Sequence, residues 1–300
     1  MISTISESFG RHDNLQPVLE PVSPYPALLI RNEADRILVI ADLHIGWEVA
    51  LSEQGIHIPS QTTKLVQKLE QIVRVVSPTE LVILGDVKHA VAKVEPEEWR
   101  DVPEFLEKAI RLVPTVKVVP GNHDGNLEPL TPRDVLILPT SGVNVLGDVA
   151  LVHGHAWPSP ELLSCSTLVM GHVHPVVVFS DPLGLRAVRQ VWVKAECNRK
   201  NLAQALLKRL KIKMVHSVET ELRERFSVEL KTSKCIILPC FNDFIGGQAI
   251  NRRGSWTKSR LRQEYIGPIL RSQSIDMEKA EVHMLDGTYL GNVSQLKAIS

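Results

Sequence analysis

The chain has 300 residues, of which 44% are hydrophobic and 23% charged, and its formal net charge is zero. This length and composition are those of a globular protein that buries a sizeable core as one large α/β domain or two smaller ones. The balanced charge gives no indication of a nucleic-acid or membrane partner. The polar N-terminus does not resemble a signal peptide, and no apolar run approaches the roughly 18 residues of a membrane span. The sequence therefore predicts a cytoplasmic protein without a membrane segment.

The four cysteines show no C-x-x-C pair and no dense spacing. They are Cys165, Cys197, Cys235 and Cys240. This pattern favours free thiols in a reducing compartment over a disulfide framework.

Short apolar runs alternate with amphipathic stretches from residue 26 to residue 180. The runs are rich in Val, Ile and Leu, as is typical of strands buried on both faces. They are PALLIR, RILVIA, ELVILG, TVKVVP, VLIL, VALVH, TLVMG and VVVF. Residues 60–78 and 96–114 have the spacing of amphipathic helices, with Ser60 as the expected N-cap of the first and Pro103 inside the second. The alternation predicts a largely parallel sheet packed between helices.

Residues 186–234 differ in composition, because thirteen Lys or Arg residues face only five Glu residues. A second basic run covers 251–262, and Trp192 and Trp256 lie in or near the two runs. This basic region, 186–262, is either a solvated face or a surface that contacts nucleic acid. We expect a basic helical insertion, followed by closing strands in KCIILP and AEVHML and a turn at Asp286-Gly287.

Five short motifs each directly follow one of the predicted strands. They are Asp42-Leu-His44, Gly85-Asp86, Gly121-Asn122-His123-Asp124, His153-Gly154-His155 and Gly171-His172-Val173-His174. In open α/β sheets, ligand sites form outside the carboxyl ends of the strands, where neighbouring loops converge. One such motif is common by chance, but five in order at strand ends predict a single site.

The residue types of these motifs suit a pair of divalent cations. Carboxylate and imidazole groups bind Mn, Fe, Zn or Ni, and glycines beside them let backbone and phosphate approach closely. Two cations about 3.5–4 Å apart can clamp a phosphoryl group and lower the pKa of a water bridging them. The motifs therefore predict a metal-dependent hydrolase of phosphoesters.

The order D-x-H, GD, GNHD, HGH and GHxH resembles the calcineurin-like metallophosphoesterase superfamily over about residues 36–180. The resemblance implies a four-layer α/β/β/α sandwich and a site for two divalent metal ions, for which Mn²⁺ is expected and Fe, Zn or Ni are the alternatives. It implies a first metal held by Asp42, His44, Asp86 and His174. It implies a second metal held by Asp86, Asn122, His153 and His172. His123 is then expected to act as general acid or transition-state stabiliser, with Asp124 orienting its ring.

Two C-terminal segments resemble a prokaryotic branch of that superfamily, typified by an archaeal phosphoesterase group and including the DNA-ligase-associated metallophosphoesterases. They are LPCFNDFIGGQAIN (238–251) and VHMLDGTYLG (282–291). The branch implies manganese-dependent phosphodiesterase activity in a nucleic-acid context. His89 stands where many superfamily members have an acidic residue, so it either contacts substrate or shapes the loop. His155 is expected beside the metal ligands, and Asn242 either lines the pocket or closes a tight turn.

We therefore expect a single domain over residues 1–300, with a metal-site core at 36–180 and an elaboration at 186–300. The expected function is phosphodiester hydrolysis by a hydroxide bridging two divalent metals. The alternatives are a DNA or RNA nuclease and a non-catalytic scaffold in nucleic-acid repair that retains the metal site.

Overall fold

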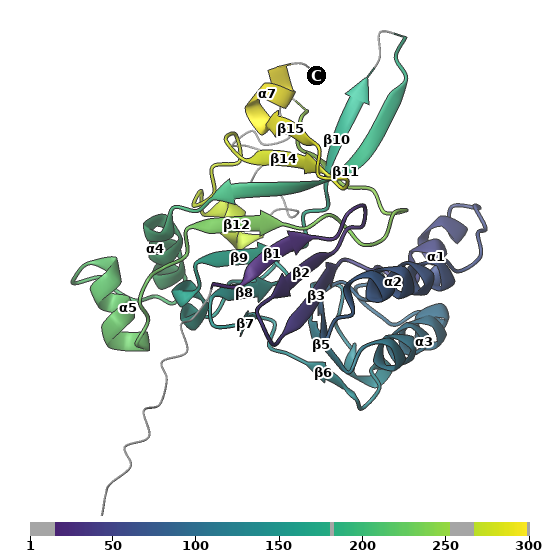
Figure 1. Cartoon of the computed structure of the whole chain (residues 1–300), viewed down its shortest axis with the longest axis horizontal. Helices are drawn as coiled ribbons and strands as arrows, with labels where there is room; N and C mark the ends of the chain where they lie inside the picture. The colour runs from purple at the N-terminus through teal and green to yellow at the C-terminus, as the bar shows by residue number, and fades with distance from the viewer. Residues whose placement is uncertain (1–15, 181–182, 253–266, 299–300) are drawn as a thin grey trace, which may run out of the picture.

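The computed structural model describes residues 16–180, 183–252 and 267–298. Two β-sheets lie against each other, and helices cover the outer face of each (Figure 1). The four layers confirm the expected α/β/β/α sandwich. The structure differs from the predicted single, largely parallel sheet in two ways. The strands form two sheets, and only some neighbouring strands in each sheet run parallel.

The first sheet has six strands in the order β1-β2-β3-β4-β5-β6. They are β1 (Val18–Pro21), β2 (Leu28–Arg31), β3 (Arg36–Ala41), β4 (Glu80–Leu84), β5 (Thr115–Val119) and β6 (Val135–Ile137). The strands from β3 to β6 are parallel, whereas β1 and β2 are antiparallel additions at one edge. Three parallel strands thus end side by side just before Asp42, Gly85-Asp86 and the loop of Asn122.

The second sheet has nine strands among the described residues and a mixed topology. They are β7 (Val143–Val145), β8 (Val149–Val152), β9 (Thr167–Met170), β10 (Pro175–Ser180), β11 (Arg186–Glu196), β12 (Lys234–Ile237), β13 (Gln248–Ala249), β14 (Glu281–Met284) and β15 (Tyr289–Asn292). The neighbours β8, β9 and β12 run parallel. Their carboxyl ends deliver His153, His172 and the loop that starts at Leu238 to one edge.

The core between the sheets arises from strands that are apolar on both faces. Val39 and Val82 of the first sheet and Val169 of the second belong to the cluster between the sheets. Their chain neighbours Ile40 and Ile83 point to the other face and pack under the helices. This two-residue alternation explains why β3 and β4 read as continuous apolar runs instead of an apolar–polar pattern.

The helices are short except for two on the first sheet. They are α1 (Trp47–Ser52), α2 (Thr62–Val76), α3 (Pro96–Leu112), α4 (Arg199–Arg209), α5 (Val218–Phe226), α6 (Pro268–Arg271) and α7 (Val293–Ala298), with 3₁₀ turns at Glu128–Leu130 and Pro160–Ser164. Leu69 of α2 and Phe105 of α3 pack on the first sheet, and Leu206 and Leu222 of α4 and α5 on the second. No described helix is long and apolar enough to cross a membrane.

The predicted helix starts need small corrections. Helix α2 begins at Thr62, preceded by Gln61, and the Ser60 hydroxyl accepts a hydrogen bond from the Thr62 backbone N–H (3.2 Å). Helix α3 includes Pro103 and starts with a capping box between Glu95 and Glu98. All four cysteines are free and buried, as expected from their spacing.

The described part of the basic region is less helical than expected, and its helices α4 and α5 lie away from the motif-bearing strand ends. Residues 186–196 form β11, whose inward-facing Trp192 is buried and belongs to the core between the sheets. Because Glu196 pairs with Lys234, and Lys234 with Thr167, α4 starts at the amino end of β9. His172 follows the carboxyl end of the same strand, so α4 and α5 lie at the opposite end of the sheet (Figure 1).

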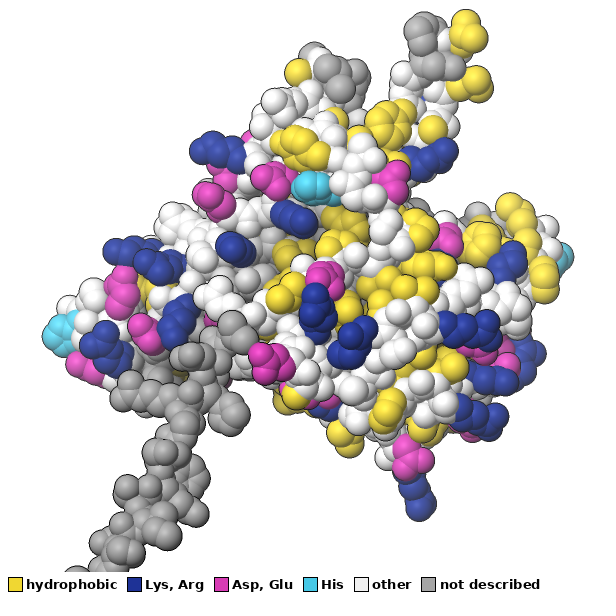
Figure 2. All heavy atoms as spheres, in the orientation of Figure 1, with side chains coloured by type: hydrophobic (Ala, Val, Ile, Leu, Met, Phe, Trp, Pro, Cys, Tyr) yellow, Lys and Arg dark blue, Asp and Glu magenta, His cyan; other side chains and the backbone are white. Residues whose placement is uncertain are grey.

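The surface of α4 and α5 carries both signs of charge. Figure 2 shows acidic side chains among the basic ones in this part of the molecule. Ion pairs join Lys200 to Glu219 (3.3 Å) and Arg225 to Glu221 (2.8 Å). In the second basic run, Asn251 and Arg252 are described, and the remainder, including Trp256, lies outside the described residues. These contacts favour a solvated face over a continuous cationic surface at α4 and α5.

Glu221 gives the helical region a testable pH dependence. Its carboxylate accepts hydrogen bonds from Arg225 and from the backbone N–H groups of Val215 and His216, which lowers its pKa to about 2. A lowered pKa stabilises the fold above the ordinary pKa near 4.5, and this contribution disappears as the pH falls toward 2. We expect Glu221→Gln to lower the melting temperature at pH 7 and to approach wild type as the pH falls.

The matched control is Glu224→Gln, an exposed carboxylate on the same helix, for which we expect no change. Thermal unfolding followed by circular dichroism from pH 7 to pH 3 measures both variants. A stability difference for Glu221→Gln that stays constant over this range would contradict an ionic origin.

Candidate metal centre

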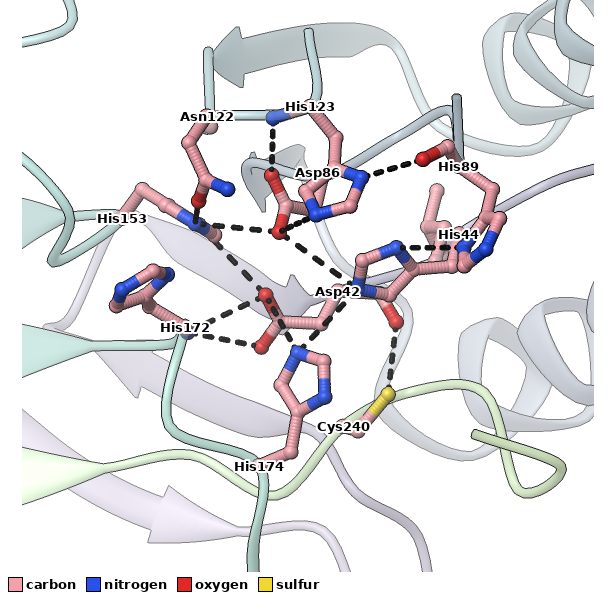
Figure 3. Close-up of polar contacts among 12 residues, drawn as sticks. Asp42, His44, Asp86, His89, Asn122, His123, His153, His172, His174 and Cys240 are labelled. Carbon is pink, nitrogen blue, oxygen red and sulfur yellow. Dashed lines mark hydrogen bonds and ion pairs between the residues drawn. The ribbon is translucent and has the colours of Figure 1, made fainter. Parts of the chain in front are cut away.

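The five motifs converge at the carboxyl ends of strands from both sheets. Loops after β3, β4 and β5 bring Asp42, Asp86 and Asn122 from one side, and loops after β8 and β9 bring His153 and His172 from the other (Figure 3). Parallel neighbours with aligned register place these ends next to one another. The sequence-predicted residues therefore lie together in space.

Several of these residues have left-handed backbone conformations. Residues with positive φ at the centre are Asp42 (62°), His44 (45°), Asp86 (47°), His172 (69°) and His174 (46°). Each such conformation costs a non-glycine residue on the order of 1–2 kcal/mol, and residues of this kind cluster at functional sites. The sharp turns bend the chain back at the strand ends and direct the side chains inward.

One group of potential ligands surrounds Asp42 and Asp86. It comprises Asp42, His44, Asp86 and His174, whose donor atoms all lie within 4.8 Å of one another. His174 Nε2 is 3.3 Å from Asp42 Oδ1, and His44 Nε2 is 3.6 Å from Asp86 Oδ2. Asp42 and Asp86 are almost completely buried.

A second group shares Asp86 with the first. It comprises Asp86, His153 and His172. His153 Nδ1–H donates to the Leu84 carbonyl (2.8 Å), which leaves Nε2 facing Asp86 Oδ2 at 3.5 Å and Asn122 Oδ1 at 3.3 Å. The backbone N–H of His172 donates to the Asp42 carboxylate (3.0 Å), which ties the two sheets together at the centre. Asp86 therefore stands between two sets of ligands.

The electrostatics of the centre are dominated by its two carboxylates. Burial disfavours a charge on His153, yet Asp86 and Asp42 outweigh it and raise the pKa of His153 to about 9. Burial and the neighbouring His153 lower the pKa of His172 to about 3. Burial opposes ionisation of Asp86, but His153 and His44 outweigh it and lower its pKa. The two carboxylates thus favour a positive charge at His153, whereas burial disfavours one at His172.

Residues 35–217 match the sequence profile of the family described as calcineurin-like phosphoesterase. The chain belongs to this family. The profile spans all five motifs, so the family assignment rests on the same residues that meet at the centre.

The crystal structure of Pseudomonas putida nuclease MPE is similar, with a TM-score of 0.50, 20% identity and coverage of 92% of this chain and 99% of that chain. This likeness shows a shared fold. The E. coli phosphoesterase Yfce also matches, with a TM-score of 0.30, 21% identity and coverage of 48% of this chain and 73% of that chain. Comparison with curated protein sequences gave no significant match.

The residues at the centre fit the metal ions on which the family depends. Two carboxylates, one carboxamide oxygen and four imidazoles make a mixed oxygen and nitrogen set suited to first-row divalent cations. The raised pKa of His153 reports the negative potential that such cations would neutralise. The chain therefore provides a candidate metal-binding cluster.

His89 and His123 form the wall of the cavity next to the metal ligands. A cavity of about 550 Å³ is lined by both rings together with His44, Asp86 and Asn122. His123 Nδ1–H donates to the His89 carbonyl, and its Nε2 lies 3.9 Å from Asp86 Oδ2. The His89 ring lies beside His44, with 3.4 Å between their Nδ1 atoms. His89 thus lies against His44 and His123 and also borders the cavity, and its contact with substrate stays a prediction.

Asp124 has a different contact from the one expected. Its carboxylate accepts hydrogen bonds from the backbone N–H groups of Val87 (2.8 Å) and Gly121 (2.8 Å). It therefore fastens the Asp86 loop to the Asn122 loop, while the His89 carbonyl, not Asp124, orients the His123 ring. Burial and the charge of Asp86 raise the pKa of Asp124 to about 6.

The other two candidates lie at the margin of the centre. The His155 ring is 5.1 Å from that of His153 and 6.2 Å from that of His172, and burial lowers its pKa to about 4. Asn242 is fully buried and does not border the cavity, because its Nδ2 donates to the Leu43 carbonyl (2.8 Å). Residues 245–248, which begin three positions after Asn242, line the cavity instead.

Glu98 is a supporting residue that the sequence analysis missed. This fully buried carboxylate of α3 accepts hydrogen bonds from the backbone N–H groups of His89 (2.9 Å) and Ala90 (2.7 Å). The spacing of Glu95 and Glu98 is that of a capping box and so indicates a helix start. No sequence pattern around Glu98 indicates that its side chain contacts the His89 loop. Glu98 therefore fixes the wall of the cavity from the outer helix layer.

Gly121 provides a test of how tightly the Asp86 loop is packed. A Cβ at this position would overlap the Asp86 carboxylate and its backbone nitrogen. We expect Gly121→Ala to displace Asp86 and to weaken metal binding by about 10–100-fold, as loss of supporting contacts does at metal sites. Competition with a chelator measures the affinity.

Gly125→Ala in the same loop is the matched control, because its Cβ would meet only the Val91 carbonyl, at 3.7 Å. We expect wild-type metal affinity for this variant. Equal affinities for Gly121→Ala and wild type would show that the loop has room to adjust.

Proposed function

We propose that the protein is a phosphodiesterase that uses two divalent cations, with Mn²⁺ as the native metal. The observation that supports this most is the position of Asp86 in both ligand groups. The proposed first set is Asp42, His44, Asp86 and His174, and the proposed second set is Asp86, Asn122, His153 and His172. When bound, the two cations would neutralise charge on the phosphoryl oxygens and would lower the pKa of the attacking water.

The remaining chemistry falls to residues of the chain itself. His123 Nε2 faces the cavity because its Nδ1–H is held by the His89 carbonyl, so we propose that Nε2 protonates the leaving oxygen. We propose that the Asn122 amide also binds a phosphoryl oxygen beside the metals. Asp124 positions the Asp86 loop and the Asn122 loop, because its carboxylate accepts hydrogen bonds from the backbone N–H groups of Val87 and Gly121.

Hydrolysis of two model esters tests the proposal. Protein loaded with Mn²⁺, Fe²⁺, Zn²⁺ or Ni²⁺ is assayed on bis-p-nitrophenyl phosphate and p-nitrophenyl phosphate. We expect faster hydrolysis of the diester, loss of activity in chelator and recovery with a divalent metal. Faster monoester hydrolysis would contradict the diester assignment, and metal-loaded protein inactive on both esters would favour a non-catalytic scaffold.

Nuclease activity is the second candidate function. The P. putida protein that shares this fold along almost its whole length is named a nuclease. The observation in this chain that favours nucleic acid is the exposed ring of Phe244, which directly precedes the cavity-lining residues 245–248 and has Lys64 over it. Nucleic acid that contacts Phe244 and Lys64 lies closer to the proposed metals than nucleic acid that contacts α4 and α5, because those two helices lie at the opposite end of the sheet.

A further inference from the structure

Trp47 places an aromatic ring directly beside the metal-ligand loop. It is the first residue of α1, and its backbone N–H donates to the His44 carbonyl (3.2 Å). The side chain is largely buried. The position of this ring is therefore tied to that of a proposed metal ligand.

Phe244 lies on Trp47 from a loop almost two hundred residues later in the chain. The two rings are stacked, with centroids 5.6 Å apart and planes inclined by 15°. The Phe244 backbone N–H donates a hydrogen bond to Asn242 Oδ1 (3.0 Å). The Asn242 Nδ2 group in turn donates one to the Leu43 carbonyl (2.8 Å). The Phe244 side chain is nevertheless 45% exposed. A rigidly held aromatic ring thus faces solvent.

Phe244 directly precedes a segment that lines the cavity of the metal centre. Residues 245–248, which directly follow Phe244, line that cavity together with Asn122, His123 and His172. Ile245 to Gln248 therefore connect the aromatic ring to the place where the scissile phosphate is proposed to bind. A group attached to that phosphate needs to extend only past this short segment to reach Phe244.

A cationic side chain accompanies the ring. Lys64 of α2 is exposed, and its Nζ lies 4.9 Å from the Phe244 ring centroid. Lys68, one turn further along, is engaged with Asp243 (2.5 Å) and the Phe241 carbonyl (2.8 Å) and so holds the loop in place. Among the described residues Lys64 forms no ion pair, so it is the cation that can meet a phosphate near the ring, whereas Lys68 has a positioning role.

We propose that Phe244, supported by Trp47, stacks on an unpaired nucleobase next to the scissile phosphate, and that Lys64 contacts the adjoining phosphate of the same strand. The substrate class is then single-stranded nucleic acid or an unpaired end, because bases inside a duplex are not free to stack on a side chain. This inference rests on the proposed phosphodiesterase function and assigns its substrate. A single exposed phenylalanine is ordinary on a protein surface. Phe244 differs because it is stacked on Trp47, has Lys64 over its ring and directly precedes cavity-lining residues.

Equilibrium binding of paired strands tests the role of the ring. The probe is a short, fluorescently labelled oligothymidylate with phosphorothioate linkages, compared with the same strand lacking its bases. Binding to the full-length, Mn²⁺-loaded protein is followed by fluorescence anisotropy. We expect Phe244→Leu to weaken binding of the base-carrying strand about tenfold and to leave binding of the abasic strand unchanged, whereas Phe244→Trp retains wild-type affinity.

Phe179→Leu is the matched control, since Phe179 on β10 is similarly exposed (41%) but lies outside the loop 244–248 that runs into the cavity. It is expected to bind both strands as wild type does. Equal losses on both strands for Phe244→Leu, or no loss on either, would overturn the stacking proposal. Base-dependent binding without diester hydrolysis would instead refute the proposed function and leave the stacking site standing.

The salt dependence of binding tests the role of Lys64. A single-strand phosphate contact contributes about 0.7 to the slope of log K against log salt concentration. We expect Lys64→Gln to reduce the slope by roughly this amount. An unchanged slope would remove Lys64 from the proposed site.

Discussion

Asp86→Asn is expected to bind neither metal firmly and to show no turnover above background. The carboxylate belongs to both ligand groups, so removing its charge weakens both sites at once. The amide keeps the size of the side chain, which limits packing changes in this buried position. Metal content after desalting, measured by elemental analysis, and diester hydrolysis are the two readouts.

Asp243→Asn is the matched control for Asp86→Asn. Asp243 is a largely exposed carboxylate on the rim, paired with Lys68, and it is in neither ligand group. We expect this variant to retain wild-type metal content. Retention of both metals by Asp86→Asn would contradict a shared ligand at this position.

His123→Ala is expected to retain its metals and to lose about 10²–10⁴-fold in kcat, the range for loss of a positioned proton donor. The ring borders the cavity, while the two ligand groups that share Asp86 do not include it. If His123 protonates the leaving oxygen, the loss is larger for a poor alkoxide leaving group than for p-nitrophenolate, which leaves without a proton.

The leaving-group comparison separates His123 from a structural residue. His57→Ala, a change at an exposed histidine outside all five motifs, serves as the control and is expected to have wild-type kinetics. A His123→Ala variant with wild-type kcat, or one that loses its metals, would refute proton donation as its role. A loss that is equal for both leaving groups would favour stabilisation of the transition state instead.

The sequence was sufficient to predict most of the strands and the meeting of the motifs. The eight apolar runs all contain strands, because β-branched and leucine-rich segments of this length are stable when both faces are covered. The rule that parallel strands share one carboxyl edge then brings Asp42, Asp86 and Asn122 together without knowledge of tertiary contacts. These predictions depended on local pattern and simple topology.

Contacts between distant segments were not predictable in the same way. Asp124 was expected to orient His123, but its carboxylate reaches the backbone of Val87 and Gly121, whose N–H groups have no sequence signature. Glu98 contacts the His89 loop from helix α3, and Phe244 stacks on Trp47 from a loop almost two hundred residues later in the chain. Such contacts depend on how loops pack against one another after the sheets have formed.

The segment 186–196 shows a second kind of failure. Its basic residues alternate with apolar ones, and the charge excess suggested a helical insertion, whereas Val191 and Val193 are buried on one face and Trp192 on the other. Tertiary pairing with β10, β12 and β14 determines the strand. Charge composition alone was therefore a poor guide to the secondary structure of this segment.

Anomalous diffraction from crystals grown with Mn²⁺ is the most direct test of the central claim. The account predicts two cations on either side of the Asp86 carboxylate, one beside Asp42 and His174 and the other beside Asn122 and His153. A single cation, or cations bound away from Asp86, would contradict it.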